Sequence, residues 1–265
     1  MLGRYMHRYL SLSHECVGLN REHFDATETW HVRRSLCSYI KQSDVVINCV
    51  GVLKPGIKSI GRANTININS VFPQLVADVC EEIGARMIHI SSDCVFSGRK
   101  GRYIETDICD ATDIYARTKC IEPENSLTLR SSFVGEDLND DGVGLIKWMQ
   151  RMENTTINGY TNCLWNGVTC LQFVKTVELI LNSDTQYSCT RHVYSSQHVT
   201  KHQLCKAINQ VYDLNITINK TKATNISGTP VFNKLDRTLF TIHDDTLTCD
   251  MSIHEQLIEQ KAFNL

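Results

Sequence analysis

Two apolar segments in the first half of the chain restrict its fold more than any other feature. The runs DVVINCVGV at 44–52 and MIHISS at 87–92 are rich in apolar residues, which is typical of strands that helices cover on both faces of a parallel sheet. Between them, residues 69–86 have a helical period that closes at Gly84, a common helix terminator. This order of strand, helix and strand predicts an α/β fold built on a parallel sheet.

The alternation of strand and helix runs through the first half of the chain. Helical spacing of apolar residues predicts helices over 2–10 and 28–42, and short apolar runs predict strands over 16–20 and 126–135. We therefore predict a Rossmann-type, doubly wound parallel sheet formed by residues 1–135.

The second half of the chain has a looser pattern. Two amphipathic helices are expected at 144–152 and 170–182, and the polar run 217–232 is expected to be a surface loop with a short strand. No linker or repeat separates this part from the first, so the boundary is soft. Residues 136–265 are predicted to form a smaller substrate-binding lobe.

Charge and cysteine content exclude several classes of protein. A formal net charge of −2 gives no global positive field for a nucleic-acid backbone or an anionic membrane. The twelve cysteines include no Cys-x-x-Cys pair, so we expect reduced thiols. Basic residues interrupt the apolar N-terminal segment, which resembles neither a signal peptide nor a membrane span. These features predict a cytoplasmic protein with no nucleic-acid or membrane partner.

One cluster of side chains has the residue types of a zinc site but not the spacing of a catalytic one. His198, His202 and Cys205 share a helical face, but no acidic residue in that segment is placed as a general base. The sequence therefore predicts no metal site.

Tyr115 and Lys119 form the strongest chemical pattern. They stand four apart on an expected helix, so both side chains project from one face. An ammonium close to a phenol lowers the pKa of the phenol and makes it usable as a general acid or base. Ser91 and Ser92 lie about twenty residues upstream at the end of a buried strand, where open α/β sheets bind ligands. The spacing predicts that these groups meet at one edge of the sheet.

Three segments together resemble a known family. SSDCVFSG at 91–98, GRYIETD at 101–107 and IYARTK at 114–119 resemble motifs of the extended short-chain dehydrogenase/reductases. Within that family they are most similar to the dTDP-4-dehydrorhamnose reductase group of sugar-nucleotide 4-keto reductases. Asp93 and Phe96 favour a reductase over the related epimerases and dehydratases.

The resemblance implies catalytic roles for three residues. Tyr115 would protonate the oxygen of a ketone while a nicotinamide supplies hydride to its carbon. Ser92 would hydrogen-bond that oxygen, and Lys119 would bind the nicotinamide ribose and hold down the pKa of Tyr115.

The resemblance also implies a dinucleotide cofactor. Arg21 follows the second expected strand and could pair with a ribose 2′-phosphate, which favours NADPH, with NADH possible. Asn69 matches an Asn that helps to order a proton-relay water in relatives. The positions carried over for the cofactor are Leu2, Gly3, Arg21, Asp25, Ala26, Asn48, Cys49, Val50, Gly51, Asn69 and Lys119.

The string NGYTNCLWNGVTCLQF at 158–173 resembles the substrate loop of related reductases. Amide side chains offer donors and acceptors to a hydroxyl-rich ligand, and an indole can cover an apolar sugar face. A nucleotide-diphosphate sugar is therefore the expected ligand, with Arg237 as the candidate for its diphosphate. The positions expected to contact it are Asp93, Cys94, Asn162, Trp165, Asn166, Thr169 and Arg237.

Two departures from the family pattern leave alternatives open. The family begins with a strand and a glycine-rich loop, of which only Gly3 is present. Either the true start lies upstream, which we favour, or the chain is a remnant with a rearranged sheet. Cys94 stands where the group has a Tyr.

The leading hypothesis is NADPH-dependent reduction of a nucleotide-linked 4-keto-6-deoxy sugar, with or without an acetamido group, in deoxysugar synthesis. One alternative is a non-catalytic regulatory or binding subunit, like the regulatory subunit of methionine adenosyltransferase, which belongs to this branch. The other is a sugar-nucleotide epimerase or dehydratase. A homodimer is possible.

Overall fold

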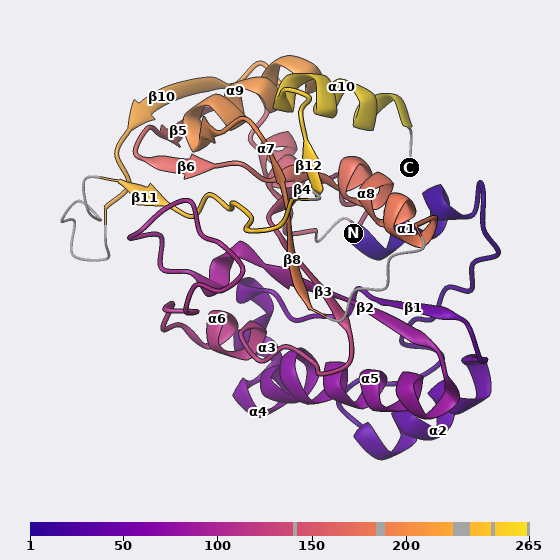
Figure 1. The fold of residues 1–265 in the computed structure, drawn as a ribbon. Coiled ribbons are helices and arrows are strands. Elements are labelled where there is room, and N and C mark those ends of the chain that lie inside the picture. Colours follow the sequence, from indigo (N-terminus) through magenta and orange to yellow (C-terminus); the bar gives the residue numbers. More distant parts are fainter. Residues whose placement is uncertain (140–141, 184–188, 225–233, 245–246, 264–265) are drawn as a thin grey trace.

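The computed structural model describes residues 1–139, 142–183, 189–224, 234–244 and 247–263, and its centre is a five-stranded sheet. All neighbouring strands in this sheet are parallel, in the order β1-β2-β3-β8-β12 (Figure 1). The strands are β1 (Val45–Asn48), β2 (Arg86–Ser92), β3 (Leu127–Ser131), β8 (Thr190–Ser195) and β12 (Leu247–Cys249). The Rossmann-type α/β class predicted from the apolar runs is confirmed.

Helices cover both faces of the sheet. On one face lie α1 (Leu2–Leu10) and α8 (Cys170–Leu181), and on the other α2 (Thr29–Tyr39) and α5 (Phe72–Ile83) (Figure 1). Successive side chains of β2 point to opposite faces. Ile88 and Ile90 therefore pack with α1 and α8, whereas Met87 packs with α2 and α5.

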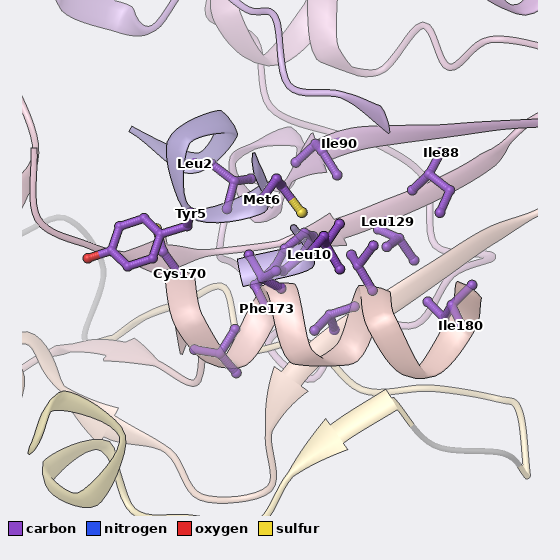
Figure 2. Packing of buried hydrophobic residues seen from close by; sticks show 14 of the residues in the cluster. Leu2, Tyr5, Met6, Leu10, Ile88, Ile90, Leu129, Cys170, Phe173 and Ile180 are labelled. Carbon is purple, nitrogen blue, oxygen red and sulfur yellow. The ribbon is translucent and has the colours of Figure 1, made fainter. Parts of the chain in front are cut away.

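The apolar stripe of α1 packs against α8 and the sheet. Leu2, Met6 and Leu10 pack in one cluster with Phe173 of α8, and Tyr5 lies beside Cys170 at the start of α8 (Figure 2). Tyr5 and Phe173 are completely buried. The apolar residues of α1 recur at helical spacing, which places them on one side of the helix, as the sequence predicted.

A chain of short elements joins β1 to α5. These are η1 (Lys54–Gly56), α3 (Ile57–Ile60), α4 (Arg62–Ile66) and the π-helical turn η2 (Asn67–Val71). Gly84 ends α5 in the left-handed conformation with φ 80°, as its position in the sequence predicted. Beyond β2 the chain forms η3 (Asp93–Val95) and then α6 (Ile114–Lys119).

Several elements of the second half of the chain surround a separate apolar cluster outside the central sheet, and we call this part the lobe. That cluster includes the fully buried Ile146, Leu204 and Leu257 from three different helices. The elements of this part are β4 (Phe133–Val134), α7 (Leu145–Arg151), β5 (Thr156–Tyr160), β6 (Cys163–Trp165), β7 (Val168–Thr169), β9 (Val199–Thr200), α9 (Lys201–Tyr212), β10 (Thr217–Thr221), β11 (Leu235–Asp236) and α10 (Ile253–Phe263). The predicted helices at 144–152 and 170–182 are confirmed as α7 and α8.

Two expectations about local structure need comment. Residues 16–20 form no strand, because none of the described strands pairs with them, and a strand without a neighbour leaves its backbone groups unsatisfied. The run 217–232 begins with β10, but residues 225–232 lie outside the described residues. No described helix combines the length and the apolar character needed to cross a membrane.

Candidate functional site

The site begins where β2 ends. Ser92 is the last residue of β2, and its Oγ accepts a hydrogen bond from the backbone N–H of Cys94 at 3.1 Å. This bond caps the short turn of η3 and fixes Asp93 and Cys94 directly beyond the strand. Polar side chains thus gather at the carboxyl edge of a parallel sheet, which is the usual ligand-binding position in such folds.

Helix α6 brings Tyr115 to the same place. Asp113 caps this helix by accepting from the backbone N–H of Ala116 at 3.1 Å, so Tyr115 lies in its first turn. The Ser92 side chain lies close enough to Tyr115 to lower the pKa of the phenol, and only 8% of the tyrosine is exposed. The two hydroxyls expected from the sequence therefore meet in the structure.

Lys119 lies in a different position from the one expected. Its Nζ donates to the carbonyl oxygen of Ile90 at 2.7 Å and lies 3.3 Å from His89 Nε2. Burial lowers the pKa of Lys119 to about 8, although Glu122 and Cys49 act in the opposite direction.

The expectation that Lys119 lowers the pKa of Tyr115 is wrong for this structure. Burial raises the pKa of Tyr115, and the nearby Cys94 adds to the increase, while the nearby Ser92 side chain opposes it. The cation over the Tyr115 ring is Lys54, whose Nζ lies 5.8 Å from the ring centroid. Because Lys54 also bonds Asp113 at 2.8 Å, its charge is largely balanced.

Asp93 is the buried carboxylate of the site. It is 7% exposed, and burial raises its pKa, whereas Lys201 and Arg237 lower it. These two cations come from the C-terminal lobe, Lys201 from the first turn of α9 and Arg237 from the residue after β11. The site is therefore shared by the sheet edge and the lobe.

A glycine turn allows Arg237 to reach the site. Gly98 has φ 85°, and a Cβ at this position would come within 2.7 Å of Leu235 and 3.2 Å of Arg237. Arg237 consequently lies over the 94–98 turn, where its Nε donates to the Phe96 carbonyl oxygen at 2.8 Å and its Nη1 lies 3.9 Å from Cys94 Sγ.

The candidate substrate residues of the lobe are buried and bonded to the protein. The side-chain amide of Asn162 donates to the Ala223 carbonyl and accepts from the Ala223 N–H, and the amide of Asn166 bonds Leu239 in the same way. Thr169 is fully buried and caps α8. The string 158–173 thus comprises three strand segments, which are the end of β5, β6 and β7, and the start of α8 rather than a loop, and its polar groups satisfy backbone atoms.

Trp165 is also largely buried, with 3% of its surface exposed. Its indole N–H donates to Ser132 Oγ at 2.8 Å, and its ring lies beneath the ammonium of Lys201, 5.1 Å from the ring centroid. Trp165 therefore borders the site through Lys201.

The cofactor candidates at the end of β1 are exposed or partly exposed residues, apart from the buried Asn48. Val50 and Gly51 are exposed, Cys49 is partly exposed, and the side chain of Asn48 accepts from the Val50 N–H at 3.0 Å. A Cβ on Gly3 would lie 3.5 Å from Cys49 Cβ, so the first turn of α1 borders the same edge. A dinucleotide that passes this edge would meet backbone from both elements.

The remaining cofactor candidates differ in how far they are exposed. Arg21 and Asp25 are exposed on turns and Ala26 is partly exposed, whereas the Leu2 side chain belongs to the core under α1. Asn69 is fully buried in the η2 turn. Its amide bonds both backbone groups of Val52 and the Thr118 hydroxyl, so it joins the β1 edge to α6.

Sequence reasoning missed Lys54, His89 and Lys201. His89 could have been noticed as a polar residue inside a buried strand, because such groups need partners. Lys201 follows Thr200, and the Thr200–Gln203 capping box was a readable helix-start signal. No signal in the neighbouring sequence predicts that this helix packs opposite Asp93.

Comparison with known proteins agrees with this geometry. Residues 1–132 match the family model described as the RmlD substrate binding domain. A dTDP-4-dehydrorhamnose reductase from Mycobacterium tuberculosis is 32% identical over 110 residues, which cover 40% of this chain and 35% of the relative. The chain belongs to the RmlD-like branch of the extended short-chain dehydrogenase/reductases. The family resemblance of the three motifs is thereby confirmed.

Further RmlD-like proteins extend the match. A dTDP-4-keto-6-deoxy-D-glucose reductase from Streptomyces niveus is 25% identical over 163 residues, covering 58% of this chain and 55% of that protein. A dTDP-4-dehydrorhamnose reductase structure from Bacillus anthracis, solved in complex with NADP, has a TM-score of 0.81 at 17% identity and covers 100% of this chain and 96% of that one. The chain thus spans about a third to a half of the curated relatives but shares the fold of the solved reductase along its length.

Proposed function

We propose that the chain catalyses NADPH-dependent reduction of the 4-keto group of a nucleotide-diphosphate-linked 4-keto-6-deoxy sugar. The observation that carries this proposal is the proximity of the Tyr115 and Ser92 side chains at the carboxyl edge of β2. The names of the Mycobacterium tuberculosis and Streptomyces niveus relatives support the choice of reaction.

The residues present fit a dinucleotide at this edge. The exposed residues Val50 and Gly51 and the side-chain-free Gly3 leave room for close approach, and Lys119 lies near Cys49 at the same edge. Arg21, exposed beyond α1, is the candidate for a 2′-phosphate. When bound, the cofactor supplies the hydride.

Tyr115 and Ser92 would act on the ketone oxygen. Because burial raises the pKa of Tyr115, its phenol is protonated at neutral pH and can donate a proton to the developing alkoxide. Ser92 would donate a second hydrogen bond to the same oxygen, and Asp93 would bind a sugar hydroxyl. A protonated phenol suits reduction of a ketone, in which the enzyme must give a proton to oxygen.

The experiment is a reductase assay with the full chain, NADPH and either dTDP- or UDP-4-keto-6-deoxyglucose. Consumption of NADPH, followed by its absorbance, is expected, and Tyr115→Phe should lower kcat by about 10²- to 10⁴-fold because it removes the general acid. Tyr160→Phe is the matched control, because Tyr160 is 43% exposed on β5.

Other outcomes identify the alternatives. Tightly bound oxidised cofactor without net NADPH consumption would indicate an epimerase or dehydratase. Absence of turnover with both sugars, together with co-purification of a partner enzyme, would overturn the proposal in favour of a regulatory subunit. The homodimer expected from the resemblance stays a prediction.

A further inference from the structure

Two cysteines are close neighbours at the carboxyl end of α6. Cys120 caps the end of this helix, and Cys109 lies in the segment between η3 and α6. Both thiols pack against the apolar cluster that contains Phe96 and Tyr103. Each cysteine side chain is the largest influence on the pKa of the other, so the two sulfur atoms lie next to one another. Both are free thiols in the structure.

A buried cation lies beside this pair. Arg130 on β3 is 3% exposed, and its Nη2 donates to Cys109 Sγ at 4.0 Å. The same nitrogen donates to Glu122 Oε1 at 2.6 Å, which holds the guanidinium in place. The Cys120 thiol and the Arg130 guanidinium lower the pKa of Cys109 to about 7, although burial acts in the opposite direction. A substantial fraction of Cys109 is therefore a thiolate at neutral pH.

Cys120 is the protonated member of the pair. The Cys109 side chain raises the pKa of Cys120, and burial adds to the increase. A thiolate next to a thiol is the arrangement in which the first sulfur is oxidised and the second then forms a bond to it. Both cysteines are partly exposed, so a small oxidant can reach them.

We propose that Cys109 and Cys120 are a redox-sensitive pair that hydrogen peroxide converts into a disulfide. The Cys109 thiolate attacks one peroxide oxygen, the O–O bond breaks, and a sulfenic acid forms while the departing hydroxide takes a proton from solvent. Cys120 then attacks the Cys109 sulfur, the S–O bond breaks, and the Cys120 proton leaves with the oxygen as water. Two thiols and one peroxide thus give one disulfide and two water molecules, and two electrons pass from sulfur to the peroxide.

The disulfide would change how α6 is held. In the reduced protein the Asp113 cap fixes the first turn of this helix. A bond between Cys109 and Cys120 would also tie the last turn to the segment before the helix, in a covalent ring that contains Tyr115 and Lys119. The inference does not depend on the proposed function, because the two thiols and Arg130 define the pair.

Peptide mapping of the full chain after treatment with hydrogen peroxide tests the proposal. The reduced chain is oxidised, the remaining thiols are alkylated, and the chain is digested with trypsin without a reductant. Arg117 and Lys119 lie between the two cysteines, so trypsin separates them unless a disulfide joins them. The expected product is the peptide 103–117 linked to the peptide 120–130, and this product should disappear on reduction.

Two variants check the order of the steps. Cys120→Ser should stop at the sulfenic acid of Cys109, which dimedone traps, and should give no cross-linked pair. Cys37→Ser is the matched control, because Cys37 is exposed on α2 and its removal should leave the cross-link unchanged. Alkylation of Cys109 in the unmodified chain should accelerate as pH rises through 7, because the thiolate is the reacting form.

Two results would overturn the proposal. One is the absence of the linked peptides at a peroxide concentration that already oxidises the exposed Cys37. The other is a set of cross-links in which Cys109 joins other cysteines as often as Cys120, which would mean that peroxide oxidises the thiols without selection. Thermal melting of Cys120→Ser shows that the variant is folded, so loss of its cross-link reports on the missing thiol.

Discussion

At the scale of single residues, the buried ammonium of Lys119 should reduce the stability of the fold. Burial lowers its pKa from 10.5 to about 8, so the folded state holds this proton less tightly than the unfolded state. That difference corresponds to about 3 kcal/mol, and a variant without the ammonium would lose the hydrogen bond to Ile90, which offsets about 1 kcal/mol of the gain. Lys119→Met should therefore raise the free energy of unfolding at pH 7 by about 2 kcal/mol. The same change removes the ammonium that is expected to bind the nicotinamide ribose.

The same shift predicts a pH dependence. Below pH 8 Lys119 is charged in both states, and the full cost of burial is present. Between pH 8 and 10.5 the folded state releases the proton and the unfolded state keeps it, so the cost falls as pH rises. The stability advantage of Lys119→Met, measured by urea unfolding at pH 7 and pH 9.5, should shrink accordingly. An advantage that is constant or absent would contradict the prediction.

The sequence predicted the positions of the two proposed catalytic hydroxyls better than the charges around them. Tyr115 and Ser92 follow from a helix spacing and a strand end, both of which are local patterns. The position of Lys119 depends on where His89 and the Ile90 carbonyl lie, and the position of Lys201 depends on how a distant helix packs. Electrostatic environment is a tertiary property, which explains why the expected pKa of Tyr115 was wrong.

At the scale of elements, Gly167 sets the approach of β6 and β7 to the segment after β3. A Cβ at this position would lie 1.9 Å from the Ser132 carbonyl oxygen, which already accepts from the Val168 N–H at 3.0 Å. Gly167→Ala must therefore displace backbone, and we expect a loss of about 3 kcal/mol in the free energy of unfolding.

Urea unfolding of Gly167→Ala against Gly56→Ala checks this expectation. A Cβ on Gly56 would meet Val52 Cγ1 at 3.6 Å, which is ordinary contact, so this control should unfold near the midpoint of the unmodified chain. Equal midpoints for the two variants would show that the β6–β7 connection can move freely.

Elements with periodic patterns were predicted well, and those that depend on pairing were not. Helices α1, α5 and α8 follow from their own apolar stripes. The apolar run at 16–20 has the composition of a strand but no partner among the described strands. The string 158–173 resembles a ligand loop because its amides could bind a sugar, yet Asn162 and Asn166 bond backbone instead.

At the scale of the whole molecule, the apolar core crosses the domain boundary expected near residue 135. Helix α8, from the second half of the chain, packs in one cluster with α1, β2 and β3 from the first half. Helix α10 then joins α8 to the rest of the lobe. The buried side chains of Gln256 and Gln260 accept the backbone N–H groups of Thr169 and Leu171 at the start of α8.

This shared packing predicts a single cooperative unfolding transition. Alkylation in increasing urea can follow the two halves separately, because buried Cys80 reports on α5 and buried Cys205 on α9. Their midpoints should coincide. Leu257→Ala, which empties a fully buried position of α10, should cost about 3 kcal/mol and lower both midpoints equally.

Exposed Cys37 and Cys189 provide the internal control, since they should react at every urea concentration. A Leu257→Ala midpoint that falls for Cys205 but not for Cys80 would mean that the lobe unfolds alone. In that case α8 would be too weak a connection to hold Lys201 and Arg237 against Asp93. Coincident midpoints would instead mean that the site, built from both halves, persists as long as the fold does.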